Sequence, residues 1–383
     1  MNILEDVNSS EAMLFRKAEA ELIPIYGIIE VSPLCNMNCD MCFVRLSHEE
    51  MESQGRLRTA EEWLQIAEQM KKAGVLFLLL TGGEPLLYPG FKELYLGLRK
   101  LGMILTINTN GAVLDEEWAD FFAKYKPRRI NITLYGADDH AYQQLCHYPG
   151  GFEKTMNAIR MLKERDVDVK LNYSLTRVNA KDLEKFIQIT KELNVPSGIN
   201  PYMIPAVRER KKSFDWSSRL DPAKAAYCSH WIHSQSKSDH SDFVNECKEK
   251  LEIIEKTKQY YKDHQEEIVP QRSSCLAGRC SFMLNWQVRM RPCVILTFPE
   301  VDVFENGFDH AWQTMVKGME ELKMNVKCTS CPKRSICDNC PAAAYYETGS
   351  VNGVSEYLCD FAEEKEKLLR DEVLKAQKDI DQE

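Results

Sequence analysis

The sequence predicts an α/β fold: an open, partial (β/α)6 TIM barrel followed by a cysteine-rich C-terminal extension. Strand-like and helix-like stretches alternate between about residues 25 and 205. They form six units at a repeat of roughly 25–40 residues, which suits βαβ units, whereas a closed barrel requires eight. In addition, eight of the 14 cysteines fall between Cys275 and Cys359. The barrel is therefore expected to stay open and to be followed by a segment organised around its thiols.

The expected strands are short apolar or β-branched runs. The run LFLLL is unbroken, which is typical of a strand buried on both faces of a parallel sheet. The six strands are expected at 25–33, 76–83, 104–111, 129–136, 168–176 and 198–204.

Stretches with helical apolar spacing separate these strands. The first two stop at Gly74 and Gly102, and the third opens with acidic residues that suit a helix N-terminus. The helices are expected at 61–74, 91–102, 115–125, 151–166 and 182–194. Such alternation predicts parallel strands joined by right-handed crossovers, with the functional site at the C-terminal ends of the strands.

The chain divides into five expected segments. Beyond the barrel, Asp221-Pro222 marks a helix start, and residues 242–267 read as a charged surface helix. The segments are an N-terminal extension at 1–24, the barrel at 25–205, a helical linker or insertion at 206–271, a cysteine-rich domain at 272–362 and a C-terminal helix at 363–383.

Composition excludes several classes of protein. The 383 residues carry 49 Lys and Arg against 58 Asp and Glu, a net charge of −9, which argues against nucleic acid as a partner. No run approaches the roughly 18 apolar residues of a membrane span. The acidic, polar N-terminus lacks the pattern of a secretion signal. We therefore expect a cytoplasmic protein, in which 14 cysteines are too many for disulfides and indicate metal binding.

The first cysteine cluster lies directly after the first strand. Cys35, Cys39 and Cys42 have the spacing C-x3-C-x2-C, which places three thiols on one tight loop. Three thiolates can hold three irons of a cubane cluster and leave the fourth iron open. A zinc site with three cysteines and a further ligand is the alternative.

The end of the second strand reads Gly82-Gly83-Glu84-Pro85 and is expected beside that loop. Two glycines let backbone groups approach a small ligand closely, and Glu84 offers a carboxylate acceptor for an ammonium group. A simple strand-to-loop turn satisfies the same four residues. Together, the three-cysteine loop and the GGEP turn resemble the radical S-adenosylmethionine (SAM) superfamily.

That resemblance implies a 4Fe–4S cluster on Cys35, Cys39 and Cys42, which would be the catalytic residues. The open iron would bind the methionine moiety of SAM. One electron would then cleave SAM to methionine and a 5′-deoxyadenosyl radical, which abstracts a hydrogen atom. Many relatives carry an Asp at the position of Tyr135 and an Arg near Cys146, and neither is present here. The residues implied to contact SAM are Phe43, Gly82, Gly83, Glu84, Pro85, Asn108, Asn110, Thr133 and Asn172.

The C-terminal cysteines have the spacing C-x4-C-x12-C, then, after a gap, C-x2-C-x5-C-x2-C-x18-C. Eight thiolates saturate two cubanes or two zinc sites. The order of spacings resembles the SPASM extension of radical SAM enzymes, which holds two auxiliary 4Fe–4S clusters and makes three in all. It departs at Val288, where the family usually has a glycine in a hairpin turn. The resemblance implies one cluster on Cys275, Cys280, Cys293 and Cys340 and an outer one on Cys328, Cys331, Cys337 and Cys359.

Cys146, Cys228 and Cys247 stand apart from both cysteine clusters and read as small buried hydrophobic residues. His230 and His233 share a helix face, but with no evident fourth ligand they are expected to be packing or surface residues.

The resemblance also implies a substrate class. Radical SAM/SPASM enzymes with two auxiliary clusters mostly modify peptides or proteins, by thioether or carbon–carbon crosslinking, epimerisation or formylglycine formation. Formylglycine chemistry ranks lower, because Val294 follows Cys293 where sulfatase maturases carry an Asp. Modification of a small molecule such as a tetrapyrrole side chain is a second alternative, and a zinc-stabilised binding protein without catalysis is a remote third.

The expected partners follow from the same reading. They are a peptide or protein substrate and an electron donor such as flavodoxin or ferredoxin. About 24 residues precede the first strand, too few for a leader-binding domain. We therefore expect either a separate leader-peptide recognition protein or direct binding of the substrate.

Overall fold

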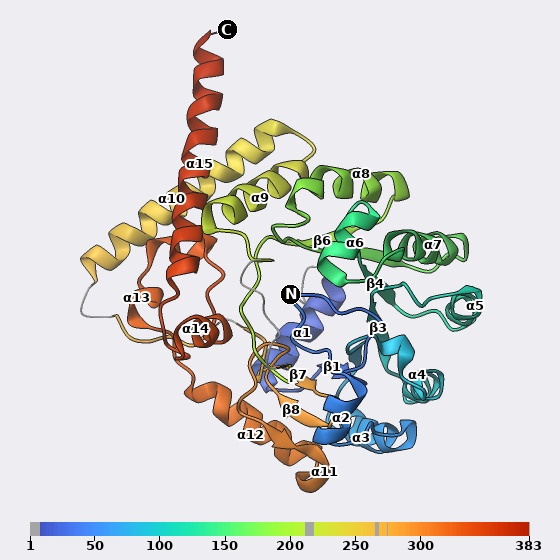
Figure 1. Cartoon of the computed structure of the whole chain (residues 1–383). Helices are drawn as coiled ribbons and strands as arrows, with labels where there is room; N and C mark the ends of the chain where they lie inside the picture. The colour runs from blue at the N-terminus through green and yellow to red at the C-terminus, as the bar shows by residue number, and fades with distance from the viewer. Residues whose placement is uncertain (1–7, 211–217, 265–267, 274, 383) are drawn as a thin grey trace.

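The computed structural model describes residues 8–210, 218–264, 268–273 and 275–382. Its centre is one sheet of nine strands in the order β6-β5-β4-β3-β2-β1-β7-β8-β9, which does not close on itself (Figure 1). The strands are β1 Tyr26–Glu30, β2 Phe77–Thr81, β3 Ile104–Thr109, β4 Arg129–Thr133, β5 Val169–Ser174, β6 Ser197–Asn200, β7 Ser281–Leu284, β8 Arg289–Arg291 and β9 Val301–Asp302. The prediction of an α/β fold with an open barrel of six parallel strands is confirmed.

The first six strands pair in parallel with their sequence neighbours, as the alternation predicts. β7 comes from the cysteine-rich segment and pairs in parallel with β1, so Ile28 lies opposite both Leu79 and Met283. β8 and β9 continue the sheet in antiparallel order. The cysteine-rich segment is therefore part of the barrel sheet, which the sequence did not predict.

Helices cover the outer face of the sheet. The helices of the N-terminal extension and the barrel segment are α1 Ser9–Glu21, α2 His48–Gln54, α3 Ala60–Lys72, α4 Phe91–Lys100, α5 Glu116–Lys124, α6 Asp139–Cys146, α7 Gly151–Glu164 and α8 Leu183–Leu193. Those that follow are α9 Pro222–Gln235, α10 His240–Asp263, α11 Val303–Asn306, α12 Phe308–Glu321, α13 Val326–Thr329, α14 Pro341–Thr348 and α15 Glu356–Gln382. In the part of the chain so described, no helix is long and apolar enough to span a membrane.

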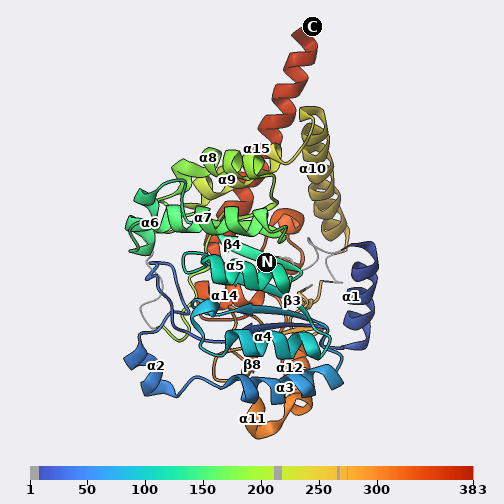
Figure 2. The same ribbon diagram turned by 90° about the vertical axis from the view of Figure 1, so that its right-hand side faces the viewer.

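α1 closes the N-terminal end of the barrel. Phe15 packs against Tyr26 of β1 and Phe77 of β2, with ring centroids 6.2 and 5.5 Å apart. α1 and α2 lie on opposite sides of the molecule in Figure 2. The chain leaves β1 toward α2, so the opposite, C-terminal end of the strands carries the three-cysteine loop.

α15 begins at Glu356, earlier than the expected start at residue 363, and therefore carries Cys359. It packs beside α9 and α10 and extends away from the body of the molecule (Figures 1 and 2).

Candidate active site

The three-cysteine loop joins β1 to α2 and is held at several points. Buried Met37 anchors it in the main hydrophobic core. The amides of Asn38 and Asp40 donate to the carbonyls of Cys146 and Leu145 at the end of α6, each at 3.0 Å. The loop is thereby fastened to a helix more than 100 residues away in sequence.

The three thiols lie close enough to influence one another. Burial raises the pKa values of Cys35 and Cys42, and the neighbouring thiols raise both further. Two of the sulfur atoms already accept main-chain hydrogen bonds: Met37 N–H donates to Cys35 Sγ at 3.4 Å and Arg45 N–H to Cys42 Sγ at 3.3 Å. Such bonds stabilise a thiolate and tune iron–sulfur clusters. Because burial raises their pKa values, Cys35 and Cys42 are protonated without a metal, and metal binding must release these protons.

The glycine turn after β2 lies directly against this loop. Gly83 N–H donates to Ser32 O and Glu84 N–H donates to Leu34 O, both at 2.8 Å. A Cβ atom added to Gly83 would stand 2.4 Å from Leu34 O, far inside van der Waals contact. The absence of side chains at the turn is therefore what allows the two strand ends to meet.

Glu84 is fully buried, and its carboxylate is occupied within the chain. It accepts hydrogen bonds from Thr109 Oγ1 at 2.7 Å, Asn110 N at 2.8 Å and Leu86 N at 3.1 Å. Burial raises its pKa to about 7, against the effect of these donors. In this structure the carboxylate ties the ends of β2 and β3 together; its expected role as an ammonium acceptor stays a prediction. Pro85 begins the short 3-10 helix Pro85–Leu87.

The next predicted contact, Asn110, also reaches the loop. Its side-chain amide lies 3.7 Å from Cys35 Sγ and donates to Asn36 Oδ1 at 2.8 Å. Asn108 lies deeper in the barrel and accepts from Asn131 Nδ2 at 2.7 Å. Asn131 has no counterpart among the residues predicted from the sequence.

The remaining predicted contacts are more dispersed. Thr133 of β4 and Asn172 of β5 are register partners and half-buried. Phe43 is half-buried beside the third cysteine, with the Arg208 guanidinium 5.2 Å from its ring centroid. The structure thus gathers the cysteines, the glycine turn and Asn110, whereas no hydrogen bond joins the described residues of the loop to Thr133 or Asn172.

Tyr135 and Cys146 are neighbours of the loop that sequence reasoning left without a role. A hydrogen bond with the Cys146 thiol and burial raise the pKa of Cys39, while Tyr135 has the opposite effect. Cys146 is completely buried, as expected of a small hydrophobic residue. Its position against a site cysteine depends on the docking of α6, which no local sequence signal reveals.

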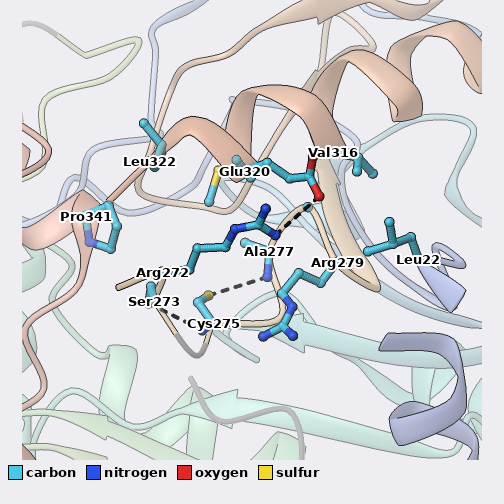
Figure 3. A pocket seen from close by; sticks show the side chains of 12 residues that line it. Leu22, Arg272, Ser273, Cys275, Ala277, Arg279, Val316, Glu320, Leu322 and Pro341 are labelled. Carbon is cyan, nitrogen blue, oxygen red and sulfur yellow. Dashed lines mark hydrogen bonds and ion pairs between the residues drawn. The ribbon is translucent and has the colours of Figure 1, made fainter. Parts of the chain in front are cut away.

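The eight C-terminal cysteines fall into two groups. In the first, burial raises the pKa of Cys293 to about 11, and the nearby Cys275 and Cys340 thiols raise it further. Cys275 also lies near Cys280, whose pKa burial raises to about 12. Figure 3 shows Cys275 at a small cavity between α12 and the residues before β7, with Ala277 N–H donating to its sulfur at 3.4 Å.

The second group lies where α15 meets the α13 region. Burial raises the pKa of Cys359, with the Cys328 and Cys331 thiols contributing. Cys331 is likewise a neighbour of Cys337, whose pKa burial raises to about 11. These two groups have the membership that the SPASM resemblance implies; that they bind clusters stays a prediction.

A cubane and a single metal ion place different demands on the geometry of their thiol ligands. All 14 cysteines are free thiols. Within the residues that the structure describes, no three His, Cys, Asp or Glu side chains are placed to hold one metal ion. Ligands of a single zinc must converge to about 2.3 Å from one centre, whereas each cysteine of a cubane binds a different iron. The choice between a cubane and zinc at these thiols stays a prediction.

His230 and His233 behave as expected of packing and surface residues. His230 Nε2 lies 3.3 Å from Glu372 Oε2 on α15, and His233 Nε2 lies 2.8 Å from Glu246 Oε1 on α10. Both rings pack on Phe243. They join three helices and converge on no common centre.

Comparisons with known proteins agree with this geometry. Residues 29–189 match the model of the Radical SAM superfamily. An AdoMet-dependent heme synthase of Methanosarcina barkeri is 25% identical over 84% of this chain and 92% of its own length. The sporulation killing factor maturation protein SkfB of Bacillus subtilis is 25% identical over 43% of this chain but only 39% of its own. The structure of Streptococcus suis SuiB bound to S-adenosylmethionine aligns with a TM-score of 0.62, at 18% identity, over 94% of this chain and 82% of that one.

Proposed function

We propose that this chain, whose residues 29–189 match the Radical SAM superfamily, is a radical SAM maturase that abstracts hydrogen from a peptide. The family resemblance predicted from the sequence is confirmed, and with it the use of SAM and an iron–sulfur cluster. The observation that carries the proposal is the three-thiol loop hydrogen-bonded to a glycine turn at the C-terminal ends of β1 and β2.

Cys35, Cys39 and Cys42 would hold a cubane with one open iron, which would supply the electron for the reductive cleavage of SAM. The chain's own residues hold and shape the site. Gly82 and Gly83 let the turn pack closely against the three-cysteine loop, where it would line the methionine end of SAM, and Asn110 holds the loop through its hydrogen bond to Asn36. Phe43 would contact the adenine, and Asn108, Thr133 and Asn172 would line the barrel interior.

We infer two further cubanes on the C-terminal thiols. The support is the division of these eight thiols into two separate groups of four. Four thiolates saturate a cubane, so neither auxiliary cluster would offer substrate an open iron. Electron transfer and structural support are the roles that remain for them.

A peptide is the proposed substrate because of two relatives. SkfB is a sporulation killing factor maturation protein, and SuiB has also been solved with its precursor peptide SuiA. The sheet ends at β6 and β9 without closing, which leaves the barrel open along one side. A one-electron donor such as flavodoxin or ferredoxin, and a separate leader-recognition protein, complete the proposed set of partners.

A tetrapyrrole side chain is the second candidate substrate. It is favoured by the match with the heme synthase, which runs over 92% of that enzyme. Formylglycine formation ranks below both. Val294 has no carboxylate, and its carbonyl accepts from Arg208 Nη1 at 2.8 Å.

The test uses the anaerobically reconstituted full chain with SAM and dithionite. We expect about twelve irons per chain, the sum of three cubanes, and release of 5′-deoxyadenosine. A peptide encoded beside this gene should then lose hydrogen or exchange it with solvent deuterium, as mass spectrometry detects. Iron-replete protein that releases no 5′-deoxyadenosine would refute the enzymatic proposal. Turnover of a propionate-bearing tetrapyrrole, with the peptide unchanged, would select the second candidate.

A further inference from the structure

Three consecutive residues beyond β6, Arg208, Glu209 and Arg210, connect the two cysteine-bearing parts of the site. They belong to a charged run in the sequence, RERKK at residues 208–212. In the structure the Arg208 and Glu209 side chains are almost completely buried, at 0% and 4% exposure. Burial of two adjacent charged side chains is costly unless each is paired, and both side chains have partners within the fold.

Arg210 reaches the three-cysteine loop. Its Nη1 donates to the carbonyl of Cys39 at 2.9 Å and to that of Cys42 at 3.3 Å. Its Nη2 donates to Asn38 Oδ1 at 2.9 Å. One planar guanidinium therefore contacts three acceptors of the loop. Its fixed fork of donors suits this geometry, which a lysine ammonium cannot reproduce.

Arg208 and Glu209 hold the same segment to the barrel and to the extension. Arg208 pairs with Glu30, the last residue of β1, through two hydrogen bonds of 2.8 and 2.7 Å. It also donates to the carbonyl of Val294, the residue after Cys293. Glu209 forms an ion pair with Arg291 on β8, two residues before Cys293.

We propose that Arg210 is a positioning residue for the three-cysteine loop, and that Arg208 and Glu209 fix it relative to the hairpin that carries Cys293. The inference rests on the proposed function, because it concerns how the chain holds its first cluster. The positive charge of Arg210 beside the loop also favours the more negative, reduced form of a bound cluster. Its removal should therefore lower the cluster's midpoint potential, which a purely structural contact would leave unchanged.

The test compares wild type, Arg210→Gln, Arg210→Lys and the surface control Arg160→Gln, all as reconstituted full chains. The midpoint potential is read from the EPR signal that shifts when SAM is added. Loss of iron is followed with a chelator. We expect Arg210→Gln to have a lower potential and roughly tenfold faster loss of iron from this cluster. Arg210→Lys should keep the potential near that of wild type and still lose iron faster, because it retains the charge without the fork.

Two outcomes separate the inference from the proposed function. If wild type cleaves SAM and both Arg210 variants match it and Arg160→Gln in potential and in iron loss, the positioning role is overturned. If wild type itself yields no SAM-responsive signal and no 5′-deoxyadenosine, the proposed function fails first. Should Arg210→Gln not fold, faster iron loss from Arg210→Lys supports the inference and an unchanged rate overturns it.

Discussion

The main-chain amide of Glu84 lies 2.8 Å from the carbonyl of Leu34, the residue that precedes the first site cysteine. This hydrogen bond, with that of Gly83 to Ser32, fastens the glycine turn to the three-cysteine loop. The two loops are therefore joined through their main chains, and a change in the turn should alter the positions of the thiols.

Gly83→Ala tests that coupling. Its Cβ would stand 2.4 Å from Leu34 O and 2.7 Å from Pro33 O, so the loop must shift. We expect SAM cleavage to fall by about 100-fold, since displacements near 1 Å can cost that much. Gly102→Ala is the matched control: it also adds one methyl group, at a glycine with φ of 88° and no atom within 4 Å of the new Cβ. It should cost about 1 kcal/mol of stability and leave cleavage intact; equal cleavage by both variants would contradict the coupling.

The grouping of thiols predicts which cysteines act together. Cys42→Ser should abolish 5′-deoxyadenosine formation and lower the iron content by about four per chain. Cys340→Ser should remove a similar amount of iron from a different cluster. Cys228→Ser, at a buried thiol on α9 far from both groups in sequence, should retain all the iron. Iron and sulfide analysis with Mössbauer spectroscopy distinguishes these results. Full iron content in Cys340→Ser would contradict the proposal that the first C-terminal group of thiols binds a cluster.

The buried pair of Arg208 and Glu30 should make a large contribution to stability only while both partners are present. Arg208→Met leaves the Glu30 carboxylate buried without its guanidinium, which should cost about 3–5 kcal/mol. Adding Glu30→Gln should recover part of that loss, because the second change removes the unpaired buried charge. Urea denaturation followed by circular dichroism gives both values. A single variant as stable as wild type would show that the pair is dispensable.

Glu62 should provide a pH-dependent contribution at the start of α3. A hydrogen bond from Arg56, opposed by partial burial, lowers its pKa to about 2. Its carboxylate also accepts from Thr59 N at 2.8 Å in a capping box. The pKa of Glu62 in the folded chain lies below the value near 4.3 of the unfolded chain. The carboxylate therefore stabilises the fold at pH values above about 4.3, and this contribution is lost as the pH falls toward 2.

Two variants of Glu62 separate charge from capping. Glu62→Gln keeps the box geometry and should match wild type near pH 2 while being less stable at pH 7. Glu62→Ala should lose about 1 kcal/mol more at pH 7 because the cap is gone as well. Thermal unfolding measured across this pH range provides the comparison. A stability difference between wild type and Glu62→Gln that does not change with pH would contradict the assignment.

Local patterns were sufficient for much of the barrel. All six strands of the barrel segment lie within or overlap the ranges expected from apolar or β-branched runs. The unbroken apolar run of β2 reflects burial along almost its whole length. The same patterns missed α1, α2 and α6. At the hairpin, Val288 adopts φ of 65°, which explains why glycine is usual at that position.

The sequence by itself determined the chemistry available to this protein: three thiols on one loop, two glycines at the next strand end and eight further thiols in ordered spacing. These are local features, so spacing along the chain reveals them. Only the tertiary structure decided what surrounds that chemistry. It placed β7 beside β1, Cys146 beside Cys39, and Arg210 across the carbonyls of a loop 171 residues away. Such contacts depend on how distant elements dock, and docking is determined by burial and charge pairing summed over the whole fold, which no short stretch of sequence records.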